Sequence, residues 1–297
     1  MEYYSTEPLR TTKTHLISPT NATRSEKILA PSILVKPIPS QVLSFNIANV
    51  DDLFPGFVMG DFAVLYGSPT VLSLSLLLTV RAQLPFQLGG LETKVVFVDG
   101  GNTFRLYHVS RIAQLSQLDP KQVLERILIS RAFTAYQMTA IVLEKLKETV
   151  DKFDSRLVII SDIAGLYLDK DIPPKEAKDV FNQLTIYLSR FAEENQLIVL
   201  ATYLPYHPSR RNAFLQEVAR GRANVVMFVK STKFGQQLVL EKHPLLSLGY
   251  AAFPSENLTI DQFTGGRRNG KNSRVLSHCF GRRDSAVELL CEGTAQR

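Results

Sequence analysis

Short apolar runs alternate with longer amphipathic stretches through most of the chain. The runs at 62–66 and 157–160 are apolar at nearly every position, which is typical of strands buried on both faces of a parallel sheet. The same pattern predicts strands at 94–98, 127–131 and 197–202. Runs joined by short turns then predict consecutive antiparallel strands at 224–230, 237–242 and 249–253.

The stretches between the first strands repeat apolar residues at helical spacing. They predict helices at 69–83, 106–115, 119–126, 135–153 and 175–194. Strands that alternate with helices indicate the α/β class, here a mainly parallel central sheet flanked by helices, with a C-terminal antiparallel extension. We assign this core domain to residues 41–263, after a flexible polar lead-in at 1–40 with one short strand at 32–35.

Composition narrows the class of protein. Of the 297 residues 45% are apolar, and the only cysteines, Cys279 and Cys291, form no C-x-x-C pair. The longest apolar runs fall short of the ~20 residues of a membrane span, and the N-terminus does not resemble a signal peptide. We therefore expect a cytoplasmic protein with no membrane partner. The histidines have no ligand spacing, so no metal site is predicted.

Positive charge is concentrated at the C-terminus. The chain has a net charge of +6, and residues 264–297 hold seven Lys or Arg residues, including Arg267 and Arg268, against three acidic ones. We expect this basic tail to be disordered. Its charge suits a polyanion such as a nucleic acid, and it equally suits a solvated tail that binds nothing.

Candidate chemistry lies where the predicted strands end. The strand at 62–66 enters its helix through Gly67, Ser68 and Pro69, where a phosphate-binding loop would lie. Such a loop, G-x-x-x-x-G-K-[ST], supplies backbone N–H donors and a lysine to phosphates and a hydroxyl to Mg²⁺. This turn has no lysine, although Thr70 supplies a hydroxyl. Asp162 directly follows another strand, as a Mg²⁺-binding Walker-B aspartate does, but a turn role is equally common.

Four further segments are distinctive. Residues 98–105 are Val-Asp-Gly-Gly-Asn-Thr-Phe-Arg, and they precede Leu-Asp-Pro-Lys-Gln-Val-Leu from 118, Ser-Arg-Ala-Phe from 130 and Leu-Val-Ile-Ile-Ser-Asp from 157. In this order, across residues 41–255, they resemble the archaeal RadA recombinases and their eukaryotic relatives in the RecA superfamily. The resemblance implies a RecA-like P-loop NTPase fold. It also implies a core-only RadA-like paralogue, because the family's small helical DNA-binding domain has no counterpart here.

The departures from the family fall on its nucleotide site. The family's phosphate loop, the Walker A motif, is longer and carries a lysine, so the motif here is degenerate. Gly101 stands where the resemblance places the catalytic glutamate, and His108 where it places an arginine that stacks on adenine. We therefore assign no catalytic residue and expect no ATP hydrolysis. The remaining nucleotide-site candidates are Gly67, Ser68, Thr70, His108 and Asp162. The N-terminus of the helix at 69–83 attracts anions, which leaves weak binding of ATP with Mg²⁺ open.

A basic segment follows the strand at 197–202. Residues 205–222 hold four arginines and one acidic residue, and the resemblance places here the mobile loop that contacts single-stranded DNA. Arginines contact phosphates and an aromatic ring stacks on bases. The DNA-binding candidates are Arg210, Arg211, Phe214, Arg220 and Arg222, with Arg267 and Arg268 of the tail. Alternatively, Phe214, Leu215 and Val218 form a helix face that packs on the core, with the arginines in solvent.

These observations predict a non-hydrolysing accessory factor in homologous recombination and DNA repair. Its predicted partners are single-stranded DNA and a RadA-type recombinase or another paralogue. Two other interpretations stay open from the sequence. One is an atypical DNA-dependent ATPase whose site a partner subunit completes. The other is a regulatory scaffold, related to RecA and KaiC, without DNA contact.

Overall fold

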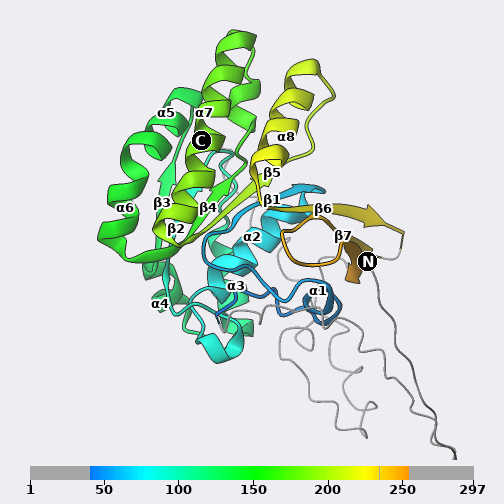
Figure 1. The fold of residues 1–297 in the computed structure, drawn as a ribbon. Coiled ribbons are helices and arrows are strands. Elements are labelled where there is room, and N and C mark those ends of the chain that lie inside the picture. The colour runs from blue at the N-terminus through cyan, green and yellow to red at the C-terminus, as the bar shows by residue number, and fades with distance from the viewer. Residues whose placement is uncertain (1–40, 234, 254–297) are drawn as a thin grey trace, which may run out of the picture. The chain divides into compact units, whose positions relative to one another are not determined.

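The computed structural model describes residues 41–233 and 235–253. Its strands lie close to the apolar runs: β1 Phe62–Gly67, β2 Lys94–Asp99, β3 Ile127–Arg131, β4 Ser155–Ser161, β5 Ile198–Tyr203, β6 Val225–Thr232, β7 Gly235–Lys242 and β8 Gly249–Phe253. They form one eight-stranded sheet in the order β3-β2-β4-β5-β1-β6-β7-β8 (Figure 1). Strands β1 to β6 are parallel, and β7 and β8 continue the sheet in antiparallel pairing. The predicted fold class is confirmed.

The five predicted helices are present in the predicted order, and α1, which was not predicted, and α8 are added to them. Their bounds are α1 Ala48–Leu53, α2 Thr70–Arg81, α3 Leu106–Leu115, α4 Pro120–Glu125, α5 Ala135–Ala140, α6 Leu146–Phe153, α7 Pro174–Asn195 and α8 Arg210–Arg222. A π-helical turn at Ile141–Lys145 joins α5 to α6, so the predicted helix at 135–153 changes pitch in its middle. Ser209 caps the N-terminus of helix α8, because its hydroxyl accepts the N–H of Asn212 at 3.0 Å.

The sheet separates two apolar layers. Alternate strand residues point to opposite faces: Leu65 and Leu200 pack with α1 to α4, while Val64 and Val199 pack with α5 to α8 (Figure 1). All four side chains are fully buried. This double burial is the reason that the central strands are apolar at almost every position.

Several predictions concern residues outside the described ranges. They are the lead-in at 1–40 with its strand at 32–35, and the basic tail at 264–297 with Arg267, Arg268 and both cysteines. Within 41–233 and 235–253, no helix has the length and apolar character needed to cross a membrane.

Asp51 on α1 is an acidic residue with an unfavourable environment. Burial raises the pKa of its carboxyl from the usual 3.8 to about 6, although Arg81 and the backbone N–H groups of Phe45 to Ile47 act in the opposite direction. One carboxyl oxygen, Oδ1, has no hydrogen-bond partner in the described part of the chain. At neutral pH the ionised form of Asp51 therefore destabilises the fold.

We expect Asp51→Asn to raise the free energy of unfolding at neutral pH by about 1–2 kcal/mol. The folded-state pKa lies above the unfolded value, so protonation of Asp51 stabilises the wild type fully below about pH 4 and this stability is lost as the pH rises through about 6. The pKa difference corresponds to about 3 kcal/mol, which partial exposure of the carboxyl reduces. Urea unfolding at neutral pH and at about pH 4 measures the effect. An equal increase in the free energy of unfolding at both pH values would contradict this account.

Candidate functional site

The turn after β1 brings Gly67, Ser68 and Thr70 together at the carboxyl edge of the parallel strands, where ligands of such sheets bind. Gly67 has a φ of 107°, and a Cβ atom at this position would lie 2.3 Å from the carbonyl oxygen of Val229 on β6. The N–H of Ser68 donates to the same carbonyl at 2.7 Å. The turn is therefore closed against β6.

Most backbone donors of this turn are already bonded or absent. The Ser68 N–H is bonded to β6, Pro69 has no N–H, and Val71 donates to the Ser68 carbonyl at 3.1 Å. The N–H of Thr70 makes a 3.4 Å contact with Ser68 Oγ, and the two hydroxyls lie 3.1 Å apart. A phosphate-binding loop needs free N–H groups and a lysine. The residues of this turn do not fit a triphosphate.

Asp162 follows β4 at the same edge of the sheet and is 3% exposed. Its N–H donates to Thr202 Oγ1 at 2.9 Å, and its Oδ1 accepts the Gly165 N–H at 3.3 Å. Its Oδ2 accepts the hydroxyl of Tyr206. Burial raises the pKa of this carboxyl, and the hydrogen bonds from Tyr206 and Gly165 act in the opposite direction. Both carboxyl oxygens therefore have partners within the protein.

Gly101 lies directly beside this carboxyl group. A Cβ atom at Gly101 would lie 2.8 Å from Oδ2 and 2.9 Å from Cβ of Asp162. The family resemblance places a glutamate at position 101. Asp162 fills the space that a side chain at this position would need. An acidic side chain at 101 would require Asp162 to move.

Asp99 is the centre of a hydrogen-bonded cluster that the sequence analysis did not identify. The side chain is fully buried at the end of β2. Its Oδ1 accepts the N–H of Thr103 at 2.8 Å and the Thr103 hydroxyl at 3.1 Å, and its Oδ2 lies 3.1 Å from Arg131 Nη2. Asp99 and Arg131 occupy paired positions on β2 and β3. Knowledge of the strand pairing would have revealed this pair.

Two tyrosines also lie at this edge. Tyr203 and Tyr206 line a cavity of about 230 Å³ together with Gly67 and Phe228. Gly67 lines the cavity directly, and Asp162 is connected to it through the Tyr206 hydroxyl. His108 lies elsewhere, at an exposed position of α3, which follows β2; β4 and β5 separate β2 from β1.

Two of the predicted DNA-binding arginines anchor α8 to the core. Arg211 donates to the carbonyl oxygen of Asp169 at 2.6 Å. Arg220 pairs with Glu241 at 3.0 Å, and its guanidinium lies 5.0 Å from the ring centre of Tyr66. These contacts hold the helix in place, although Nε of Arg220 has no hydrogen-bond partner in the described part of the chain.

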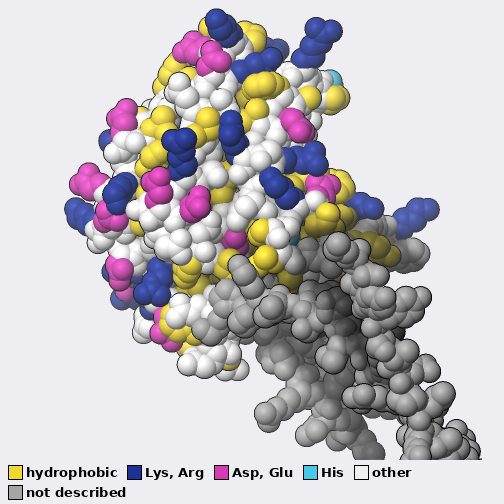
Figure 2. Space-filling view, in the orientation of Figure 1, with side chains coloured by type: hydrophobic (Ala, Val, Ile, Leu, Met, Phe, Trp, Pro, Cys, Tyr) yellow, Lys and Arg dark blue, Asp and Glu magenta, His cyan; other side chains and the backbone are white. Residues whose placement is uncertain are grey.

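Other side chains of this helix reach the surface. Arg210 and Arg222, at its two ends, are exposed. Phe214 is 38% exposed, and Lys178 of α7 lies 4.6 Å from its ring centre. Leu215 is fully buried, so the segment is a helix that packs on the core through Leu215, whereas Phe214, which the alternative interpretation placed on the same face, is exposed. Figure 2 shows Lys and Arg side chains over α7 and α8, interspersed with Asp and Glu.

Known proteins match this chain through its central part. The Rad51 family model matches residues 49–205. The meiotic recombination protein DMC1 of Saccharomyces cerevisiae is 32% identical over 130 residues, which are 42% of this chain and 38% of that protein. The DNA repair and recombination protein RadA of Aeropyrum pernix is 31% identical over 129 residues, which are 42% of this chain and 40% of that protein.

The matched segment is thus about two fifths of the length of these curated relatives. The family model, which covers more than half of the chain, includes the strand ends that carry Gly67, Asp99 and Asp162. The chain belongs to the Rad51 family.

Proposed function

We propose that this chain is a paralogue of the RadA-type recombinases with a degenerate Walker A motif, and that it assists homologous recombination and DNA repair without hydrolysing ATP. Membership of the Rad51 family supports the role in recombination. The closed turn at Gly67 carries the proposal that ATP is not hydrolysed, because the Ser68 N–H is bonded to β6 and no lysine follows.

The environment of Asp162 supports the same proposal. The Tyr206 hydroxyl bonds to the carboxylate, and Gly101 replaces the acid that the family resemblance places beside it. Phosphoryl transfer depends on positioned charges and donors. Loss of one such donor reduces a rate by about 10²–10³-fold, and here the lysine, the acid and the loop donors are absent or bonded elsewhere.

A phosphate-release assay on the purified full-length chain tests this proposal. We expect no turnover above the protein-free blank, with or without single-stranded DNA, while an active RadA-type recombinase serves as the positive control. Turnover that Asp162→Ala abolishes would overturn the proposal. The assay is repeated with the recombinase added as its Walker-lysine variant, because turnover in that mixture alone would favour a site completed by a partner subunit.

We propose single-stranded DNA and a RadA-type recombinase, or another paralogue, as binding partners. The exposed side chains of α8 and α7 support DNA contact: Arg210 and Arg222 supply charge at the two ends of α8, and Phe214 with Lys178 supplies a half-exposed ring beside a cation. Arg267 and Arg268 remain candidates from the sequence. Arg211 and Arg220 also remain candidates, although their guanidinium groups contact the Asp169 carbonyl and Glu241 within the protein.

We expect the double variant Arg210→Ala/Arg222→Ala to flatten the salt dependence of single-stranded DNA binding. Each lost phosphate contact reduces the slope of log K against log salt by about 0.7, so the expected change is about 1.4. Fluorescence anisotropy at several salt concentrations measures it. The control, Arg111→Ala/Lys152→Ala, removes the same charge from exposed positions on α3 and α6. Equal slopes for both variants, or no wild-type binding at about 50 mM salt, would contradict DNA contact at α8.

A further inference from the structure

A cavity of about 460 Å³ lies at the C-terminal end of α2, at the opposite end of that helix from the turn at Gly67. Its polar lining includes Ser44, Arg81, Gln87, Ser116 and Gln117, and its apolar lining is leucine. Cavities of this size and mixed character bind small molecules. The cavity is separate from both sites of the proposed function.

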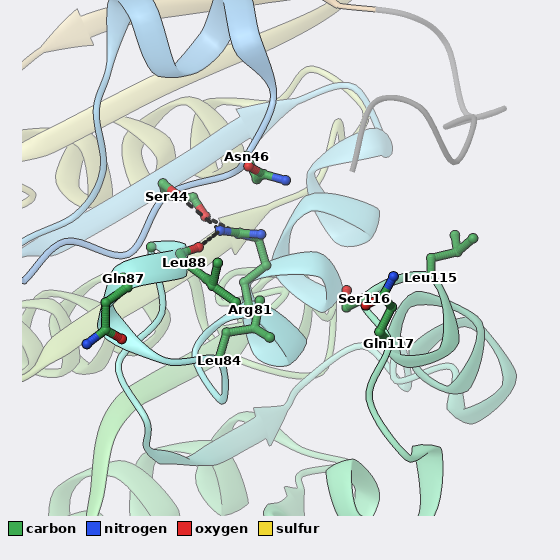
Figure 3. A pocket seen from close by; sticks show the side chains of 10 residues that line it. Ser44, Asn46, Arg81, Leu84, Gln87, Leu88, Leu115, Ser116 and Gln117 are labelled. Carbon is green, nitrogen blue, oxygen red and sulfur yellow. Dashed lines mark hydrogen bonds between the residues drawn. The ribbon is translucent and has the colours of Figure 1, made fainter. Parts of the chain in front are cut away.

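Arg81 is the distinctive residue of this cavity because it is a cation that is only 4% exposed. Its Nε donates to the Ser44 carbonyl at 2.7 Å, and its Nη2 donates to Ser44 Oγ at 3.2 Å and to the Leu88 carbonyl. All three acceptors are uncharged. Its Nη1 makes no hydrogen bond to a described residue. Figure 3 shows Ser44 and Leu88 on one side of the guanidinium, and Ser116 and Gln117 across the cavity from it.

This arrangement leaves a buried charge without a close counter-ion. Arg81 forms no ion pair with an acidic side chain in 41–233 or 235–253. Burial lowers the pKa of Arg81 to about 10, although the charge of Asp51 acts in the opposite direction over a longer range. A guanidinium removed from water is unfavourable unless an anion compensates it. An oxyanion in the cavity would supply both the charge and an acceptor for Nη1.

We propose that this cavity binds a small molecule that carries one carboxylate or phosphate group, with the oxyanion on Nη1 of Arg81. The Nε–Nη2 edge is already bonded to Ser44 and Leu88, so the ligand meets the guanidinium through Nη1. Ser116 and Gln117 offer hydrogen bonds to the rest of the ligand. Leu84, beside Arg81, and Leu115, across the cavity, add apolar lining that suits a short hydrocarbon portion (Figure 3).

Titration of the full-length, ¹⁵N-labelled protein with defined probes tests the proposal. Isovalerate carries a carboxylate on a short apolar chain, inorganic phosphate carries the alternative anion, and isovaleramide matches the first probe in shape without its charge. We expect at least one anion to shift the Arg81 Nε–H signal saturably, and isovaleramide to leave it unchanged. Whichever anion binds identifies the class of ligand. If neither binds, or if the amide binds as well as the acid, the proposal is wrong.

Three variants assign the effect to Arg81. Arg81→Gln should weaken binding of the anion about tenfold or more, because it removes a charged donor; binding to this variant is followed by calorimetry. Arg156→Gln is the matched control, since Arg156 is exposed and lines a different cavity. Asp51→Asn removes the negative charge that acts on Arg81 and should tighten binding several-fold. This last variant keeps the test decisive if Arg81→Gln does not fold. Unchanged affinity in both variants would overturn the proposal.

Discussion

Replacing Asp99 with alanine is expected to lower the free energy of unfolding by about 2–4 kcal/mol, because two buried donors of Thr103 lose a charged acceptor and the partly exposed Arg131 loses its counter-ion. The carboxylate is fully buried and accepts the N–H and hydroxyl of Thr103 while it pairs with Arg131. The variant leaves the Thr103 N–H without its acceptor and the guanidinium without its counter-ion. Both groups then remain partly or fully out of water.

Urea unfolding of Asp99→Ala measures this effect, and Asp119→Ala is its control. Asp119 also accepts a backbone N–H, that of Lys121 at 3.1 Å, but it is an exposed helix cap. Loss of such a cap costs about 1 kcal/mol. The double variant Asp99→Ala/Arg131→Ala should be less destabilised than the sum of the two single variants, because neither partner is then left alone. If Asp99→Ala lowers the free energy of unfolding no more than Asp119→Ala does, the hydrogen-bonded cluster around Asp99 does not stabilise this edge of the sheet.

The hydrogen-bonded cluster around Asp99 also positions Gly101 and Asp162. Asp99, at the end of β2, bonds to Thr103 and to Arg131 of β3, and the Thr103 hydroxyl bonds in turn to Ser161 at the end of β4. Gly101 lies within this connection, and Asp162 directly follows Ser161. The close approach of Gly101 to the Asp162 carboxyl is therefore supported by the buried Asp99 carboxylate, which pairs with the partly exposed Arg131 of the next strand.

The apolar runs located every strand of the described sheet. Strands β1, β2, β4 and β5 are buried at nearly every position, whereas β3, β7 and β8 carry exposed positions and were recognised by their apolar and β-branched residues and their short turns. Helix α8 was harder to predict from its sequence. Only three of its residues are buried, Asn212, Leu215 and Ala219. The arginines and other polar residues between them make the helical repeat of apolar positions difficult to recognise. Ser209 was the available signal, since serine favours the position before a helix.

The candidate site could be located from the sequence but its contacts could not. The strand-end residues Gly67 and Asp162 were found because each directly follows an apolar run. The Tyr206 hydroxyl that bonds to Asp162 comes from 44 positions further along the chain, and Asp99 pairs with a residue 32 positions away. Both contacts depend on which strands are neighbours, and apolar periodicity does not specify strand order.

Gly67→Ala is expected to lower the free energy of unfolding by about 2–4 kcal/mol. At a φ of 107° alanine is strained, and its methyl group would lie 2.3 Å from the Val229 carbonyl oxygen, a backbone atom of a central strand. Gly221→Ala is the control, because a Cβ atom there has no neighbour within 4 Å and the residue lies inside α8. Alanine at that helical position should be stabilising by about 1 kcal/mol.

The stability of Gly67→Ala also tests whether this chain can bind ATP. The methyl group can be accommodated only if the turn moves away from β6, and the same movement would release the Ser68 N–H from the Val229 carbonyl. Urea unfolding of both glycine variants is therefore combined with ATP titration by calorimetry. A destabilised Gly67→Ala that does not bind ATP supports a permanently closed turn. If the variant instead keeps wild-type stability, the turn opens readily, and the proposal that this chain does not hydrolyse ATP loses its main structural support.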